Sequence, residues 1–352
     1  MAELQFHNVG ITALAGCIPR NKIVNREYTQ YFPQLDVTEI VEKTGIEERR
    51  FAPETICASD LCYAAAEQLI ADHNIDIRDI DLLIFVSQTA DYRMPATSIL
   101  LQDRLGLKKD VMAFDINLGC SGFVYGLSVV YSLMERSNFK KALLLDGETR
   151  SRIYHPKDRK TAFLFGDAGI AALIERNPKF GQSWFSLNSD GSKSGLISMK
   201  AGGYRNPTTV ETLKERVIDE HGNISTDDHG TMDGGEVFNF VLREIPSSIK
   251  HMYQWSGVSK EKIDFFVFHQ ANNFMNGYLQ KKLKISDDQC PKSLQKFGNT
   301  SSVSIPITIV SELKDQLTGN KKLFLSGFGV GMSWANAIIQ TENLKISDII
   351  EL

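Results

Sequence analysis

The sequence repeats itself at about half its length, and this internal repeat restricts the possible fold more than any other feature. The run IDLLIF at 80–85 returns as IDFFVF at 263–268. The run KKALLL at 140–145 returns as KKLFL at 321–325, in the same order and about 180 residues later. Apolar strands of unrelated origin resemble one another, but several matches in register favour a duplicated structural unit.

A third match lies between the two strand-like runs of each copy. Gly119-Cys120-Ser121 corresponds to Gly298-Asn299-Thr300, and each triplet precedes an apolar segment of helical length. We therefore predict two similar halves, residues 1–176 and 177–352, that meet at a pseudo-twofold axis. A site at their junction would draw on both halves.

The strand-like runs also define the fold class. The segments 80–88 and 140–148 each contain a continuous apolar run, as in strands that are buried on both faces, and residues 121–137 between them are long enough for a buried helix. This alternation predicts an α/β architecture. The segment 178–231 is rich in Gly, Ser, Asn and Lys, so we expect turns, edge strands and a surface insertion there.

Cys120 is the strongest candidate nucleophile. It lies between a strand-like run at 111–116 and the helical segment, where unpaired backbone N–H groups and the helix dipole would stabilise a thiolate. Gly119 and Gly122 would permit a tight turn and close approach of a substrate. The alternative is a small cysteine packed in the core.

His269 and Asn299 are the candidate partners of this cysteine. His269 ends a continuous apolar strand, where side chains emerge into the clefts of α/β proteins. Asn299 precedes an apolar helix, and the repeat places it opposite Cys120. A structural histidine and an asparagine that caps a helix or holds a turn are the alternatives.

A Cys–His–Asn set of this kind favours acyl transfer with carbon–carbon bond formation over proteolysis. Two neutral donors, His269 and Asn299, would hold a thioester carbonyl oxygen and stabilise the enolate that forms when a carboxylate leaves as carbon dioxide. That carbanion would attack the acyl group on Cys120. The second oxyanion would need backbone donors, for which the N–H of Cys120 and the glycine-rich run 327–331 are candidates.

Composition excludes several other functions. The net charge of −4 gives no basic field for nucleic acid, and no run of about 18 apolar residues spans a membrane. The first ten residues lack the pattern of a secretory signal. The sequence has no CxxC pair, the pattern that would indicate zinc, so we expect no metal. The odd number of cysteines favours free thiols in a reducing cytoplasm. The five are Cys17, Cys57, Cys62, Cys120 and Cys290.

Seven short motifs together resemble the beta-ketoacyl-ACP synthase III family, in its order and spacing and over nearly the whole chain. They are KTGIEERR (43–50), DINLGCSGFVYGL (115–127), FGDAG (165–169), NSDGS (188–192), HQAN (269–272), FGNTSS (297–302) and SGFGVGMSW (326–334). The resemblance implies a thiolase-like fold with a layered αβαβα core and a homodimer. It also implies an acyl-CoA donor, a malonyl-ACP extender and no cofactor.

The resemblance also implies roles for single residues. Cys120 would be the nucleophile, and His269 and Asn299 the decarboxylation pair. It places Phe328, Gly329 and Val330 near the reacting groups and the oxyanion. It places Met94 in the acyl pocket of the partner subunit. At the surface that binds coenzyme A or the acyl carrier protein it places Lys43, Arg152, Asn272, Phe274, Lys281 and Lys282.

Several positions depart from the family pattern. Phe274 stands where the family has an arginine that binds the carrier, and Asn239 stands where it has a basic residue. Glu39 stands where the family has a tryptophan that stacks on adenine, and nearby Lys43 replaces an arginine. Ile170 follows FGDAG where a small residue is usual. The reactive residues are kept while the delivery surfaces differ, so we expect a specialised enzyme, with a carrier-bound donor as one option. Phe274 would either form an apolar surface contact or pack inward.

Two alternatives remain from the sequence. A non-condensing acyltransferase would move the Cys120 acyl group to an alcohol or amine. A catalytically silent subunit of a heterodimeric synthase would need none of the three residues. Chemistry that needs an acidic general base is disfavoured, because no glutamate neighbours the motifs around Cys120, His269 and Asn299.

Overall fold

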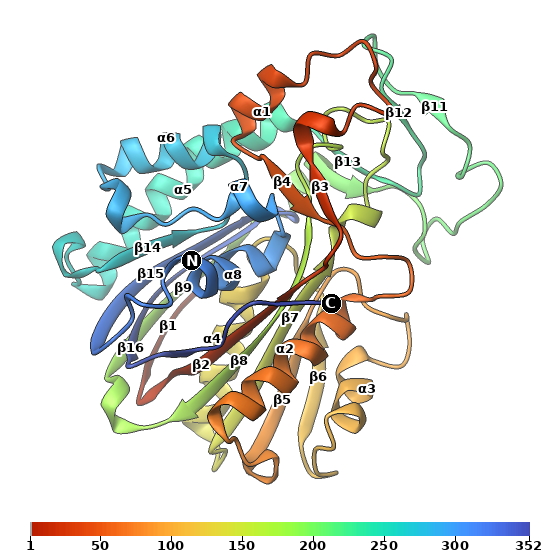
Figure 1. The fold of residues 1–352 in the computed structure, drawn as a ribbon. Helices are drawn as coiled ribbons and strands as arrows, with labels where there is room; N and C mark the ends of the chain where they lie inside the picture. Colours follow the sequence, from red (N-terminus) through yellow and green to blue (C-terminus); the bar gives the residue numbers. More distant parts are fainter. Residues whose placement is uncertain (1) are drawn as a thin grey trace.

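The computed structural model describes residues 2–352, which form two central β-sheets (Figure 1). The larger sheet has the strand order β17 (Lys345–Ile346), β2 (Val9–Ile18), β8 (Asp167–Arg176), β7 (Lys141–Thr149), β5 (Ile80–Val86), β6 (Met112–Ile116), and β18 (Ile350–Glu351) also pairs with β2. The smaller sheet has the order β1 (Ala2–His7), β9 (Gln182–Ser189), β16 (Ser333–Glu342), β15 (Asn320–Gly329), β14 (Phe265–Phe268).

The two sheets share one topology. The order β2-β8-β7-β5 in the first corresponds to β9-β16-β15-β14 in the second, with antiparallel, antiparallel and parallel pairing in both. This confirms the predicted pseudo-symmetric architecture. Each sheet is extended at the equivalent edge by a strand from the other end of the chain, β1 on β9 and β17 on β2. The division of the chain at residue 176 stays a prediction.

Helices separate and cover the sheets, which gives the predicted αβαβα layers (Figure 1). The central helices α4 (Gly122–Arg136) and α8 (Ser304–Glu312) contact strands of both sheets. Helices α2 (Ala58–His73) and α3 (Thr97–Arg104) cover the outer face of the larger sheet, and α5 (Gly234–Ser256) covers that of the smaller sheet, with α6 (Asn273–Leu283) against it. No helix within residues 2–352 has the length and apolar content of a membrane span.

Burial on both faces explains the continuous apolar runs. Successive side chains of a strand point to opposite faces, so Leu82 and Ile84 of β5 join the central core while Leu83 and Phe85 join the core under α2. A strand covered by helices on both sides therefore has apolar residues at nearly consecutive positions.

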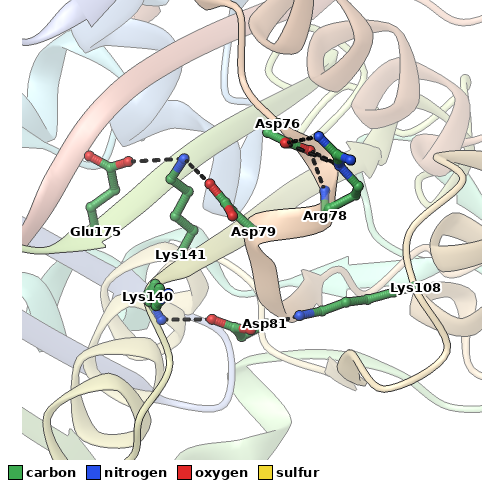
Figure 2. A network of polar contacts seen from close by, with 8 residues as sticks. All are labelled: Asp76, Arg78, Asp79, Asp81, Lys108, Lys140, Lys141 and Glu175. Carbon is green, nitrogen blue, oxygen red and sulfur yellow. Dashed lines mark hydrogen bonds and ion pairs between the residues drawn. The ribbon is translucent and has the colours of Figure 1, made fainter.

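The repeated Ile-Asp and Lys-Lys motifs hold the start of a central strand pair in each half. Asp81 accepts hydrogen bonds from the backbone N of Lys140 (2.7 Å) and from Lys108 Nζ (2.9 Å), within the polar network of Figure 2. Asp264 of the second half accepts from the backbone N of Lys322 (2.8 Å). Equivalent aspartate carboxylates therefore fix the start of the neighbouring strand in the two halves, at the end of the strands opposite to the candidate active site.

The segment 178–231 differs in part from its prediction as a surface insertion. Its later part forms short two-stranded pieces, with β11 (Arg216–Val217) on β12 (Ile224–Ser225) and β10 (Ile197–Met199) on β13 (Gly230–Met232). Its first part, however, is β9, an inner strand between β1 and β16. The polar composition concealed this strand, because the buried positions of β9 include Ser183 and Ser186.

Candidate active site

Cys120 lies in the turn between β6 and α4, as the sequence predicted, and only 5% of it is exposed. The end of β15 approaches it closely. A Cβ atom on Gly329 would lie 2.8 Å from Cys120 Sγ, and one on Gly327 would lie 2.9 Å from the carbonyl oxygen of Cys120. Glycine is therefore required at both positions, because any larger residue would displace the cysteine.

His269 follows the last residue of β14 and is 2% exposed. Its Nδ1 lies 3.1 Å from the carbonyl oxygen of Ser301 and 2.7 Å from Ser304 Oγ. A carbonyl oxygen only accepts, so the proton of the neutral ring belongs on Nδ1, and Nε2 is left as an acceptor. The ring of Phe328 holds the imidazole edge to face, with the ring centroids 5.5 Å apart.

This arrangement differs from the expected pair of neutral donors. With its single proton on Nδ1, the neutral His269 ring would donate to Ser301, so Nε2 would donate only from an imidazolium. The proton for that nitrogen is available from the Cys120 thiol.

The two polar atoms of the Asn299 side chain have different surroundings. Its Oδ1 accepts a hydrogen bond from the backbone N of Ser301 (2.9 Å), which holds the turn before α8. Its own backbone N donates to the carbonyl oxygen of Leu164 (2.8 Å). The amide nitrogen Nδ2 has no hydrogen-bond partner within the part of the chain that the structure describes, and Asn299 lines the same cavity as Cys120. A donor therefore remains available for a substrate.

The surroundings of Cys120 favour the thiolate. Burial alone would raise the pKa of this thiol, but the charge and hydrogen bond of His269, the charge of Arg150 and the hydroxyl of Ser301 outweigh it and lower the pKa to about 7. Burial raises the pKa of Cys17 and of Cys290 to about 12. Cys120 therefore carries a reactive thiolate near neutral pH, whereas those two thiols stay protonated.

The three candidate residues meet in one cavity of about 40 Å³, as the repeat predicted. Phe328, Gly329 and Val330 also line it, together with Arg150, Tyr154 and Asn272. Asn272 was expected at the delivery surface, but here its Oδ1 caps α6 by accepting from the backbone N of Met275 (2.9 Å). No group of three or more His, Cys, Asp or Glu residues in 2–352 is arranged to hold a metal, and the expectation of no cofactor stays a prediction.

The predicted delivery residues fall into two groups. Lys43, Phe274 and Lys281 line one surface groove of about 730 Å³ beside α6. Phe274 is 62% exposed and packs against Phe238, with ring centroids 4.8 Å apart, so it is a surface residue.

The other delivery residues lie apart from this groove lining. Lys282 is on α6 but is not part of the groove wall. Arg152 donates to the carbonyl oxygen of Ile56 (2.6 Å). Met94, which was expected in the acyl pocket of the partner subunit and not at the delivery surface, is 75% exposed and lies before α3.

Sequence reasoning missed Arg150, Tyr154, Ser301 and Ser304. Arg150 directly follows β7, so the strand-end criterion that selected His269 would also have selected it. Ser301 and Ser304 carry no comparable signal, because serine is common at helix starts.

Comparison with known proteins agrees with this geometry. The family model of 3-oxoacyl-[acyl-carrier-protein] synthase III matches residues 114–191, which include Cys120. The model of the C-terminal part of the same synthase matches residues 254–341, which include His269 and Asn299.

Similar proteins cover almost the entire chain. The beta-ketoacyl-[acyl-carrier-protein] synthase III of Streptococcus agalactiae is 33% identical over 94% of this chain and 98% of its own. That of Caldanaerobacter subterraneus is 32% identical over 94% of this chain and 97% of its own.

Solved structures show the same agreement. The crystal structure of a 3-oxoacyl-(acyl-carrier protein) synthase from Burkholderia xenovorans is 36% identical and superposes with a TM-score of 0.93 over 100% of this chain and 99% of its own. With a Cys–His–Asn set in one cavity, the chain therefore belongs to the beta-ketoacyl-[acyl-carrier-protein] synthase III family and is an acyltransferase of the ketoacyl synthase type.

Proposed function

We propose that Cys120 accepts an acyl group from a thioester and that the enzyme condenses it with malonyl-ACP, releasing carbon dioxide and a 3-oxoacyl thioester. The observation that carries this proposal is the convergence of Cys120, His269 and Asn299 on one cavity. A cysteine protease uses its asparagine to orient the histidine, whereas here Ser301 and Ser304 hold His269. The amide nitrogen of Asn299 is thus free for a substrate.

The first half-reaction loads the acyl group. The Cys120 thiol gives its proton to Nε2 of His269, and the thiolate attacks the thioester carbonyl. The donor's thiolate leaves and takes a proton from water, so the imidazolium is kept. The close approach of Gly329 to Cys120 places the end of β15 beside the acyl carbon, where backbone N–H groups would stabilise the oxyanion.

The second half-reaction forms the carbon–carbon bond. His269 Nε2–H and Asn299 Nδ2–H would hold the thioester oxygen of the malonyl group, so that loss of carbon dioxide leaves an enolate stabilised by two hydrogen bonds. The enolate carbon attacks the acyl carbon on Cys120. The Cys120 thiolate leaves, which restores the thiolate–imidazolium pair. Over the whole reaction the protein neither gains nor loses a proton.

The groove beside α6 is the proposed site for the carrier or coenzyme A. Four lysines line it, together with Phe274 and two acidic residues: Lys43, Lys281, Lys284, Lys292, Glu42 and Asp287. A positive groove favours the acidic surface or the phosphates of such ligands. Lys43 is held by Glu39 (2.6 Å), both more than 70% exposed, and this pair replaces the aromatic stacking that the resemblance implies.

A homodimer is the proposed assembly. Within residues 2–352, β6 pairs only with β5, so its other edge is open. Met94 (75%), Met112 (43%) and Tyr92 (64%) expose apolar surface near this edge. An open strand edge with apolar neighbours is a surface that proteins cover by pairing, most often with a second copy around a twofold axis. We place the enzyme in the cytoplasm, because its five cysteines are free.

The decisive experiment separates the two half-reactions. The protein is incubated with acyl thioesters and weighed intact, and released carbon dioxide is then measured after addition of malonyl-ACP. The proposal expects an acyl adduct on Cys120 and a 3-oxoacyl-ACP product. An adduct that is passed to an alcohol or amine without loss of carbon dioxide would instead establish a non-condensing acyltransferase.

A further inference from the structure

Arg150 brings a buried guanidinium group to the wall of the reaction cavity. It is the first residue after β7, it is 4% exposed, and it lines the same cavity as Cys120 and Asn299. Hydrocarbon side chains form much of the remaining wall, among them Leu164 and Val237. A charged group in such a wall is costly unless something in the cavity or the protein binds it.

The protein satisfies this guanidinium only in part. Nη1 donates to Gln88 Oε1 (3.2 Å) and Nη2 donates to Tyr154 Oη (3.0 Å), and both partners are neutral. Nε is buried and has no hydrogen-bond partner within residues 2–352. An arginine has five N–H groups in a planar fork, so donors remain after these two bonds.

Nearby groups balance the charge without occupying those donors. The guanidinium carbon lies 5.5 Å from the ring centroids of both Tyr154 and Phe165. The Glu148 carboxylate is buried close by, but it accepts from the backbone N of Gln88 (3.1 Å) and from the hydroxyl of Thr89 (2.9 Å). Nε is shielded from the cavity, so the donors left for a ligand are the second N–H groups of Nη1 and Nη2.

An acyl group on Cys120 would lie against this wall. A plain alkyl chain would bury the free donors against hydrocarbon and leave them without water or any other acceptor. An acyl group that carries an oxygen acceptor would pair with them. Because Arg150 and Cys120 line the same cavity, the acceptor oxygen belongs within a few bonds of the thioester, which favours a short acyl group.

We propose that Arg150 and Tyr154 select a short acyl donor that carries an oxygen acceptor, a carboxylate or a hydroxyl group, in preference to a plain alkyl donor of the same size. This inference rests on the proposed function, because the acyl group must first be loaded on Cys120. It narrows the donor from any acyl thioester to an oxygen-bearing class.

The test is a competition between donors of equal size on the wild-type enzyme. 3-Hydroxybutyryl-CoA competes with pentanoyl-CoA, and succinyl-CoA with 4-methylpentanoyl-CoA, and the adducts on Cys120 are compared by intact mass at short times. We expect at least one oxygen-bearing donor to load about 10- to 100-fold faster than its alkyl counterpart, because a site built to bind a polar group rejects the analogue that leaves it unpaired. Which pair shows the larger ratio distinguishes a carboxylate from a hydroxyl.

Two variants assign the preference to these residues. Arg150→Met should bring the ratio within about threefold of unity, and Tyr154→Phe, which removes only the hydroxyl, should reduce it partly. The ratio of two donors on one protein cancels any change in thiol reactivity, and melting temperatures report on folding. If the alkyl donor loads as fast as its oxygen-bearing counterpart in both pairs in the wild type, or if the ratio is unchanged in Arg150→Met, the inference is overturned. A protein whose Cys120 accepts none of the four acyl groups, either from coenzyme A or from an acyl carrier protein, overturns the proposed function itself.

Discussion

The Nδ1 atom of His269 lies 3.1 Å from the carbonyl oxygen of Ser301, and this contact determines which ring nitrogen faces the thiol. Because the proton is on Nδ1, Nε2 is the base for Cys120. The imidazolium that results is a hydrogen-bond donor in decarboxylation. In the proposed mechanism His269 therefore takes part in both half-reactions, whereas Asn299 offers only a neutral amide for the second.

Alanine variants of these two residues should consequently differ. Asn299→Ala should slow decarboxylation of malonyl-ACP by about 10²–10³-fold, because one oxyanion-type donor is lost, and should leave acylation of Cys120 largely intact. His269→Ala should slow both steps, since the charge that favours the Cys120 thiolate is lost as well. Single-turnover acylation and carbon dioxide release are measured separately. Equal loss of acylation in both variants would contradict this division.

The pKa of Cys120 predicts a pH dependence for its alkylation. Because a thiolate is the reactive form, the rate of modification by iodoacetamide should rise with pH and level off above about pH 7. In His269→Ala the midpoint should move upward, since burial then acts with less opposition. Cys17 and Cys290, with pKa values of about 12, should stay unmodified over the same range. The check is peptide mapping across a pH series, and labelling of either control cysteine before Cys120 would refute the assignment.

The close approach of Gly329 to Cys120 predicts a selective loss of activity. In Gly329→Ala the added Cβ would lie 2.8 Å from the thiol sulfur, so the sulfur or the end of β15 must move. We expect acylation to fall by about 10²-fold or more, because misplacement by about 1 Å costs this much. Gly234→Ala is the matched control, since a Cβ there meets no atom within 4 Å. Full activity in Gly329→Ala would show that β15 is not held against the cysteine.

The fold could be predicted from the sequence because its main features are local and repeated. A strand covered on both faces is mostly apolar, so the run from Leu82 to Phe85 predicted a buried strand directly. The aspartates Asp81 and Asp264 recur because each ties down the neighbouring strand in its own half. By contrast, β9 was obscured by Ser183 and Ser186, whose burial depends on partners distant in sequence.

The site could be predicted only for residues with a strong chemical identity. Cys120, His269 and Asn299 each stand at the end of a regular element, and the repeat related two of them. The proton arrangement on His269 could not be predicted, because it depends on a carbonyl oxygen of Ser301, which every residue type possesses. The role of Arg150 was hidden for a related reason, since only the fold shows that its guanidinium is buried rather than exposed.

The open edge of β6 predicts a change in assembly. Met94→Glu would place a charge in the apolar surface proposed for the dimer, so we expect dimer dissociation to become at least about tenfold easier. The measurement is molar mass by light scattering across a concentration series. Val217→Glu in β11, 67% exposed in the wild type, is the control and should leave the mass unchanged. A Met94→Glu protein with an unaltered mass profile would place the interface elsewhere.

The exposed ring of Phe274 predicts an altered dependence on the carrier protein. Phe274 is 62% exposed at the start of α6 and lies in the groove with Lys281. Its aromatic contact with Phe238 extends an apolar patch where the resemblance implies an arginine. One charge pair fewer then contributes to carrier binding than with an arginine at this position, so the condensation rate should fall less steeply with salt than in Phe274→Arg.

Phe274→Arg should restore the charged mode of carrier binding. We expect a severalfold faster condensation with a generic acidic carrier at low salt, a steeper loss of that rate as salt rises, and a slower reaction with the native carrier. Val217→Arg adds the same charge at a similarly exposed apolar position on β11 and should alter neither carrier preference nor salt dependence. The rates of both variants are measured with both carriers across a salt series. An unchanged carrier preference with a lowered melting temperature would mean that Phe274 serves the packing of Phe238 rather than the binding of a carrier.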